Sequence, residues 1–81
     1  MAGGCRDAVL SAFVRLEDRL GRAEFSLQVV VSEVLADTDQ FSERTIRTHI
    51  TSRMCAQAPK NHGTVYSDLD RVGRGRYRRR P

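Results

Sequence analysis

The chain has 81 residues, with 14 basic and 10 acidic side chains and a formal net charge of +4. A chain of this length folds as one small domain without room for a large enclosed cavity, which argues against an elaborate active site. Two cysteines are too few for a disulfide framework, and no apolar run approaches the roughly 18 residues of a membrane span.

The N-terminus and the reactive residue types favour a simple intracellular protein. The opening MAGGCRDAV lacks the charged-then-apolar order of a signal peptide. The cysteines and histidines, Cys5, His49, Cys55 and His62, show no spacing typical of metal ligands, and no nucleophile, base and oxyanion donor fall together. We therefore expect a cytoplasmic, non-enzymatic protein with reduced thiols, no cofactor and no metal ion.

Charge is unevenly distributed along the chain. Residues 1–40 carry four basic and seven acidic side chains, a net charge of −3. Residues 41–81 carry ten basic and three acidic side chains, a net charge of +7, and nine of those ten bases are arginine. Arginine presents a planar fork that can bind phosphate or guanine through two hydrogen bonds, so this bias favours a nucleic-acid partner.

A first helix is expected from residue 5 to residue 20. Its apolar positions step by four, four, three and four, the period of one helix face: Cys5, Val9, Phe13, Leu16 and Leu20. Gly21 is typical of the position just after a helix. Residues 1–4 are expected to form a flexible N-terminus.

A very short strand at Phe25 and a second helix over about residues 27–36 are expected next. Ser26 suits the N-cap of that helix. Consecutive valines at 29–31 favour a strand instead, and a buried strand is the alternative. Helical spacing favours the helix and predicts that its apolar residues face inward: Leu27, Val30, Val31, Val34 and Leu35.

A third helix is expected from Ser42, a good N-cap, through Met54, and it must end by Pro59. Ile46, Ile50 and Met54 form one apolar stripe, beside which His49 is expected to be a structural residue. The remaining polar surface suits phosphate oxygens and base edges, although a solvated helix face is the alternative. Its candidate DNA-binding residues are Arg44, Thr45, Arg47, Thr48, Thr51 and Ser52.

A C-terminal β-hairpin is expected, with residues 68–72 pairing with residues 76–80 around Gly73-Arg74-Gly75. Tyr77 is expected to attach the hairpin to the core. Residues 78–81 are expected to form a basic tail, attracted to phosphates or serving only solubility. The candidate DNA-binding residues of this region are Arg71, Arg74, Arg76 and Arg78.

The loop before the hairpin adds three candidates, Lys60, Asn61 and His62. An asparagine can pair with adenine or bind a phosphate, and a histidine can donate to a phosphate. Alternatively, Asn61 adopts a left-handed turn and caps the loop through its own side chain.

The expected order is helix, short strand, helix, helix, hairpin, over residues 5–77. This is the order of a winged helix-turn-helix, an α+β fold in which the third helix enters the major groove and the hairpin, or wing, lies along the phosphate backbone. Both segments expected to touch DNA lie in the basic half of the chain, which supports the same interpretation.

Three motifs carry a resemblance to a known family: RTIRTHITSRMC, then APKNH, then YSDLDRVGRGRY. Together they resemble a small winged-helix domain that is often appended to HNH-type and other restriction endonucleases, and the match covers roughly residues 25–77. The resemblance implies DNA binding, and reading of modified bases in restriction or defence systems. The chain contains no HNH histidine pair and no acidic metal cluster, so no nuclease activity is carried over.

Two functions of different classes therefore stand as hypotheses. In the first, the protein binds double-stranded DNA through the third helix and the hairpin. In the second, its acidic first helix docks a separately encoded nuclease or transcription regulator. The sequence leaves the target site and the oligomeric state open.

Overall fold

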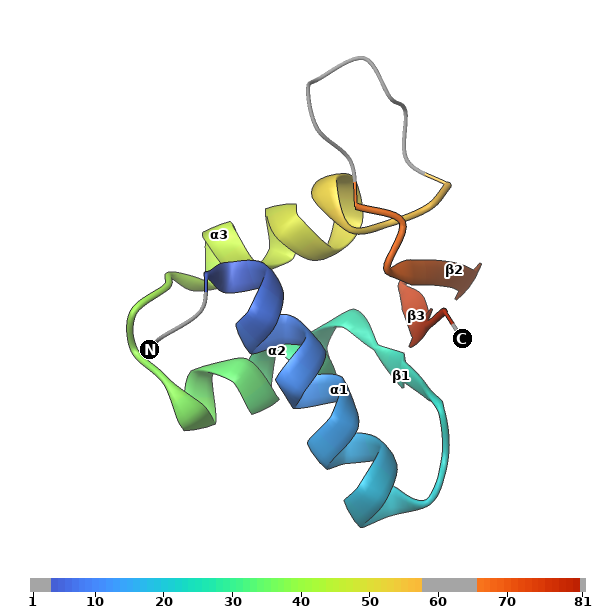
Figure 1. The fold of residues 1–81 in the computed structure, drawn as a ribbon, viewed down its shortest axis with the longest axis horizontal. Helices are drawn as coiled ribbons and strands as arrows, with labels where there is room; N and C mark the ends of the chain where they lie inside the picture. The colour runs from blue at the N-terminus through green and yellow to red at the C-terminus, as the bar shows by residue number, and fades with distance from the viewer. Residues whose placement is uncertain (1–3, 58–65, 81) are drawn as a thin grey trace.

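The computed structural model describes residues 4–57 and 66–80. This part of the chain forms a small α+β domain of three helices and a three-stranded antiparallel sheet (Figure 1). In chain order the elements are α1 (Cys5–Leu20), β1 (Glu24–Ser26), α2 (Leu27–Asp37), α3 (Glu43–Thr48), the π-helical turn η1 (His49–Arg53), β2 (Leu69–Gly73) and β3 (Arg76–Arg79).

Helix α1 has the predicted bounds. Gly21 follows it in a left-handed conformation, φ 66°, and donates its backbone N–H to the carbonyl oxygen of Glu17. Phe13 and Leu16 of the predicted apolar face are buried, but Leu20, which has the same helical spacing, is 46% exposed. Leu20 is the last residue of α1, and Figure 1 shows this end of the helix running past α2 toward the connection to β1.

Residues 27–37 form a helix, so the alternative of a buried strand is wrong. Ser26 caps it as predicted, because its Oγ accepts a hydrogen bond from the backbone N–H of Val29 at 3.2 Å. Burial of Val30, Val31 and Val34 outweighs the strand preference of β-branched residues. Leu35 was predicted to face inward but is 40% exposed, because it lies about 100° around the helix axis from the fully buried Val34.

The third helix begins as predicted, with the Oγ of Ser42 accepting from the backbone N–H of Thr45 at 3.1 Å. It does not stay α-helical to its end: the Met54 N–H donates to the carbonyl oxygen of His49, five residues back, at 2.8 Å. In an α-helix every fourth residue drifts by about 40° around the axis. The wider π-turn offsets that drift, so Ile46, Ile50 and Met54 are all fully buried.

The predicted hairpin is present, and its turn contains Gly75 at φ 65°. Strand β1 pairs with β3, so the strand order is β1-β3-β2 and Phe25 lies opposite Tyr77. The prediction that a basic tail starts at residue 78 is wrong for Arg78 and Arg79. Both lie in β3, where Arg78 pairs with residues of β1 and β2 and Arg79 pairs with Leu69 of β2.

The core lies between the helices and the inner face of the sheet. Phe13 and Phe25 meet edge to face with ring centroids 6.0 Å apart. Tyr77 is only 5% exposed, which confirms that it attaches the hairpin to the core. Both cysteines are free and buried, and burial raises the pKa of the Cys5 thiol. Within the described ranges, no helix is long and apolar enough to cross a membrane.

Candidate functional site

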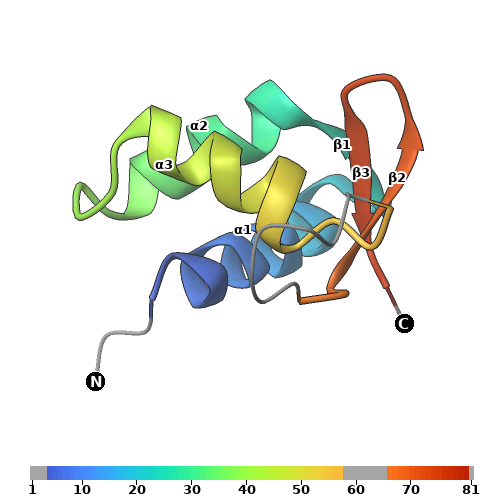
Figure 2. The same cartoon turned by 90° about the horizontal axis from the view of Figure 1, so that it is seen from above.

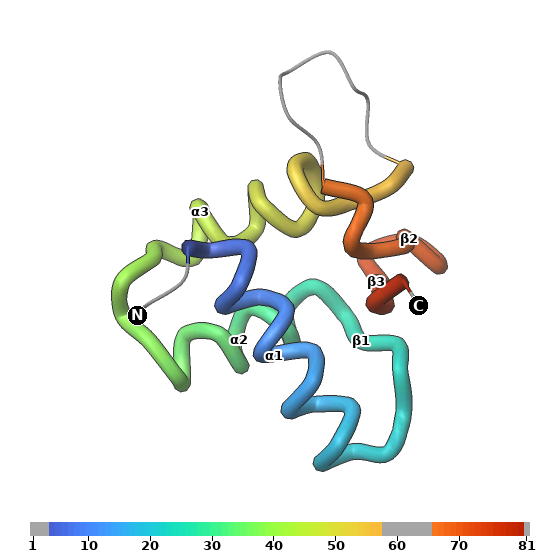
Figure 3. Tube along the Cα trace, in the orientation of Figure 1, coloured from blue at the N-terminus to red at the C-terminus, as the bar shows by residue number. Residues whose placement is uncertain are grey.

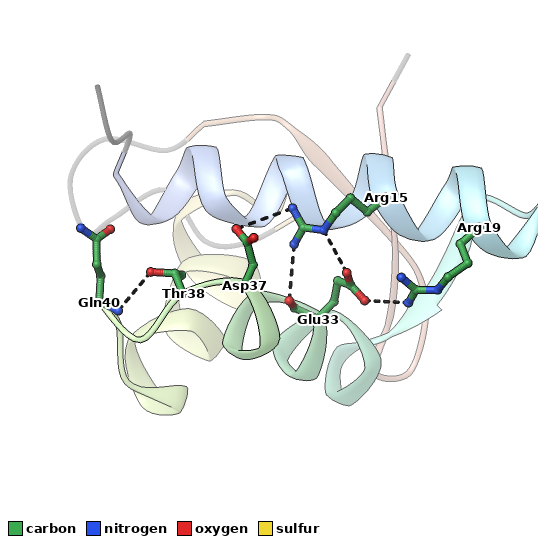
Figure 4. A network of polar contacts seen from close by, with 6 residues as sticks. All are labelled: Arg15, Arg19, Glu33, Asp37, Thr38 and Gln40. Carbon is green, nitrogen blue, oxygen red and sulfur yellow. Dashed lines mark hydrogen bonds and ion pairs between the residues drawn. The ribbon is translucent and has the colours of Figure 1, made fainter.

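Arginines on α1 are held by carboxylates of the neighbouring helix. Glu33 of α2 accepts hydrogen bonds from Arg15 at 2.9 Å and from Arg19 at 2.7 Å, and Arg15 also lies 3.8 Å from Asp37 (Figure 4). These hydrogen bonds, that of Arg19 first, lower the pKa of Glu33 below its ordinary value. The positive charges of Arg15 and Arg19 therefore serve the packing of α1 against α2.

Two further arginines tie α1 to the sheet region. Arg6 makes two hydrogen bonds to the Asp68 carboxylate, at 2.7 and 2.9 Å, and its guanidinium lies 4.3 Å from the centre of the Tyr66 ring. Arg79 of β3 makes two hydrogen bonds to Glu17, at 2.9 and 2.6 Å, which lower the pKa of Glu17. The Arg79 side chain therefore holds β3 against α1 and is not available to a partner.

The six residues predicted on the third helix divide into two sets. Arg44, Thr48 and Ser52 recur at every fourth position and are exposed. Within the described part of the chain, their side chains make no hydrogen bond or ion pair. These three residues are called the outward face below, and their polar groups are available to a partner.

The other three residues are engaged within the protein. The hydroxyls of Thr45 and Ser42 lie 3.0 Å apart in the helix cap, and Thr51 donates to the Arg47 carbonyl oxygen at 2.9 Å. The Arg47 side chain donates to Glu43 at 3.0 Å and also to Gln28 of α2. Arg47 therefore joins α3 to α2. His49 is half-buried with its Nδ1 3.2 Å from the Thr45 carbonyl oxygen, which agrees with its expected structural role.

Around the hairpin turn, Arg71, Arg74 and Arg76 are exposed. Among the described residues, no carboxylate oxygen lies within 4.0 Å of their guanidinium groups. Figure 2 shows the hairpin at the end of the molecule where η1 ends. The Gly75 carbonyl oxygen in the turn accepts from the Leu27 N–H at 2.9 Å, so Arg74 and Arg76 present positive charge beside the start of α2 at that end of the molecule.

Arg78 has a different environment from the turn arginines. It is half-buried on the outer face of the sheet, directly across from Glu24 of β1 and from Asp70 of β2. Two acidic neighbours offset its charge locally, so Arg78 is a weaker candidate than Arg74 or Arg76.

The sequence-based prediction omitted one residue with the same character. Arg53, at the end of η1, is exposed and has no carboxylate within 4.0 Å in the described ranges. Its place at the end of the same helix, directly after Ser52, was the available signal. The predicted Lys60, Asn61 and His62 lie outside the described residues.

The described residues contain no group of three or more His, Cys, Asp or Glu side chains that could hold a metal ion. A family model described as Domain of unknown function (DUF7669) matches residues 9–79. The chain belongs to this family. The match spans the chain from α1 through β3 and therefore includes the outward face and the hairpin. No match was found among curated proteins or among solved structures.

Proposed function

We propose that the protein is a non-enzymatic, double-stranded DNA-binding module of the winged helix-turn-helix type. Helices α2 and α3 would form the helix-turn-helix, the third helix would enter the major groove, and the β2–β3 hairpin would be the wing. The order of elements and the pairing of β1 with β3 beside the hairpin support this proposal. The proposal implies a cytoplasmic protein with access to DNA.

One observation carries the proposal: the arginines of α1 are paired with carboxylates, whereas, within the described ranges, those of the outward face and of the hairpin turn are not. Arg15 and Arg19 on α1 lie against carboxylates, whereas among described residues Arg44, Arg74 and Arg76 do not. An unpaired guanidinium in water gains most from a dense array of anions, and duplex DNA carries one negative charge per about 1.7 Å of its axis. The unpaired arginines therefore fit a nucleic-acid backbone.

The two parts of the surface would have separate roles. The outward face of Arg44, Thr48 and Ser52 offers a guanidinium and two hydroxyls, which can hydrogen-bond to base edges. The turn residues Arg74 and Arg76, beside Gly75, would bind phosphates without regard to sequence. In this scheme the helix provides specificity and the wing provides affinity.

A salt titration of duplex binding tests the proposal. Fluorescence anisotropy of a labelled duplex should show strong binding at about 50 mM salt that falls steeply as salt rises, because several phosphate contacts release counterions. Absence of duplex binding at about 50 mM salt would refute the proposal. A randomised duplex library, made with modified and with unmodified bases, then tests the restriction-related role that the family resemblance implies.

Protein docking through α1 is the second candidate, favoured by the exposure of Val14. This side chain is 48% exposed, and Asp7 and Asp18 lie on the same outward face of the helix. Neither acid has a basic group within 4.0 Å among the described residues. A pull-down with and without DNase separates the candidates, since a partner bridged by DNA is lost on nuclease treatment and a partner docked on α1 is kept.

A further inference from the structure

The outer edge of β2 is covered by the chain that follows η1. β3 pairs with one edge of β2. On the other edge, the Leu69 N–H donates to the carbonyl oxygen of Met54 at 2.9 Å, and the Ala56 N–H donates to the carbonyl oxygen of Leu69 at 2.8 Å. Figure 3 shows the start of β2 passing beside the end of η1. The end of the third helix is thus fastened to the base of the hairpin.

Gln57 continues this covering with its side chain. Its Oε1 accepts a hydrogen bond from the backbone N–H of Arg71 at 2.8 Å, as the carbonyl of a neighbouring strand would. Its Nε2 donates to Oδ1 of Asp70 at 3.1 Å. Both polar ends of the carboxamide are therefore bonded to β2, two residues nearer the hairpin turn than Leu69.

Between Arg71 and the hairpin turn, the pairing of β2 with β3 is irregular. The register between β2 and β3 shifts between Arg71 and Gly73, which leaves Val72 without a partner on β3. Gln57 bonds to β2 directly before this irregularity. On its inner side the hairpin is held by β1, which pairs with β3, and by the Gly75 carbonyl oxygen in the turn, which accepts from the Leu27 N–H at 2.9 Å. Without the Gln57 carboxamide, the outer side of β2 would be held to the third helix only at Leu69, and the backbone at Arg71 and Val72 could move away from that helix.

We infer that Gln57 is a positioning residue for DNA binding: it fixes the β2 side of the wing relative to the third helix, so that both meet the same duplex without further ordering. The inference rests on the proposed function. Ordering flexible groups on binding costs affinity, and a wing that is already fixed avoids this cost. The carboxamide is suited to this role because it accepts from Arg71 and donates to Asp70, whereas a glutamate would set a second carboxylate against Asp70.

Two substitutions and a double-mutant cycle test the inference. Gln57→Leu removes both hydrogen bonds, and Gln57→Glu keeps the shape but adds repulsion. Each should weaken duplex binding about threefold to tenfold and reduce the salt dependence, since the wing contacts are lost. In an Arg71→Ala/Arg74→Ala/Arg76→Ala background the same changes should have almost no effect, because the wing then has no exposed, unpaired arginine to position.

Gln40→Leu is the matched control, because Gln40 is an exposed glutamine in the connection between α2 and α3 and should leave binding unchanged. Circular dichroism establishes that each variant is folded at the temperature of the assay. Additive effects of Gln57→Leu and the wing substitutions, or an unchanged salt dependence, would overturn the inference while leaving the proposed function intact. Failure of the wild-type protein to bind any duplex would overturn both.

Discussion

The arginines of helix α1 and those at the turn of the β2–β3 hairpin have opposite environments. On α1, Arg15 and Arg19 share the carboxylate of Glu33 at 2.9 and 2.7 Å. At the hairpin turn, Arg74 and Arg76 have no carboxylate within 4.0 Å among the described residues. The number of arginines in a segment therefore does not identify a binding surface. Their pairing with acids does, because paired arginines already have an anion.

Pairing with acids also determines which positive charges of the basic half, residues 41–81, stay available at the surface. The basic half contains three acids, and in the fold each lies beside arginine: Glu43 binds Arg47, Asp68 binds Arg6, and Asp70 lies near Arg80 and across from Arg78. Among the described residues of this basic half, the charge that stays available is concentrated on five exposed arginines: Arg44, Arg53, Arg71, Arg74 and Arg76.

The largest effect should come from removing equal charge in the two regions. Arg74→Ala/Arg76→Ala should weaken binding to all duplexes tenfold to hundredfold, about 1.4 to 2.8 kcal/mol, and lower the salt slope by about 2. Arg15→Ala/Arg19→Ala removes the same charge and should instead lower the unfolding temperature. Anisotropy titrations and thermal denaturation measure the two effects. Equal losses of affinity in both variants would mean that net charge, rather than its placement, determines binding.

A smaller and more selective effect is expected at the outward face. Arg44→Ala should reduce the preference for one base pair about tenfold, roughly 1.4 kcal/mol, because a guanidinium that reads a base edge is lost. Thr48→Ala should likewise change the ranking among sequences. Competition binding with single-base variants of the best duplex measures the ranking, and Arg74→Ala serves as the control that weakens all sequences alike. A uniform loss for Arg44→Ala would mean that it binds only phosphate.

Glu33→Gln tests the scaffold side of the comparison. Because its hydrogen bonds to Arg19 and Arg15 lower the pKa of Glu33 in the folded state, ionised Glu33 stabilises the fold above its ordinary pKa. That contribution is lost as the pH falls through the lowered pKa. We expect Glu33→Gln to reduce the free energy of unfolding by about 1 kcal/mol at pH 7. Urea denaturation from pH 7 to about pH 3 should show a weaker pH dependence than in the wild type.

Asp18→Asn is the control for that measurement, since Asp18 is exposed and has no basic partner within 4.0 Å in the described part of the chain. It should leave the pH dependence between pH 7 and 3 closer to that of the wild type. The same pH dependence in wild type and Glu33→Gln would mean that the carboxylate of Glu33 contributes nothing measurable to packing of α1 on α2.

Features set by neighbouring residues were predictable from the sequence. The bounds of α1, the caps Ser26 and Ser42, and the hairpin around Gly75 follow from periodicity and turn chemistry within a few residues. The exposure of Leu20 was not predictable, because burial depends on which distant element covers a residue. The π-turn was also not predictable, because Ile46, Ile50 and Met54 already have the spacing of an ordinary α-helix.

For the candidate site, residue type was predictable but pairing was not. The sequence indicated an arginine-rich surface on the third helix and the hairpin. It did not indicate that Arg79 binds Glu17, 62 residues away, or that Arg47 reaches Gln28. Such contacts arise only when the chain has folded. The structure therefore reduces the prediction to the unpaired arginines, and it adds Arg53.

The smallest effect is predicted at Arg47, which lies on the same helix as Arg44 but is bonded to Glu43 and Gln28. Arg47→Ala should lower the free energy of unfolding by up to about 0.5 kcal/mol, as for an exposed pair one helical turn apart. Duplex affinity should fall less than about threefold, with the ranking of sequences unchanged, because the guanidinium already has partners within the protein. A changed ranking in competition binding would show that Arg47 leaves Glu43 to read a base. The pairing seen without a ligand would then be a poor guide to which arginines bind DNA.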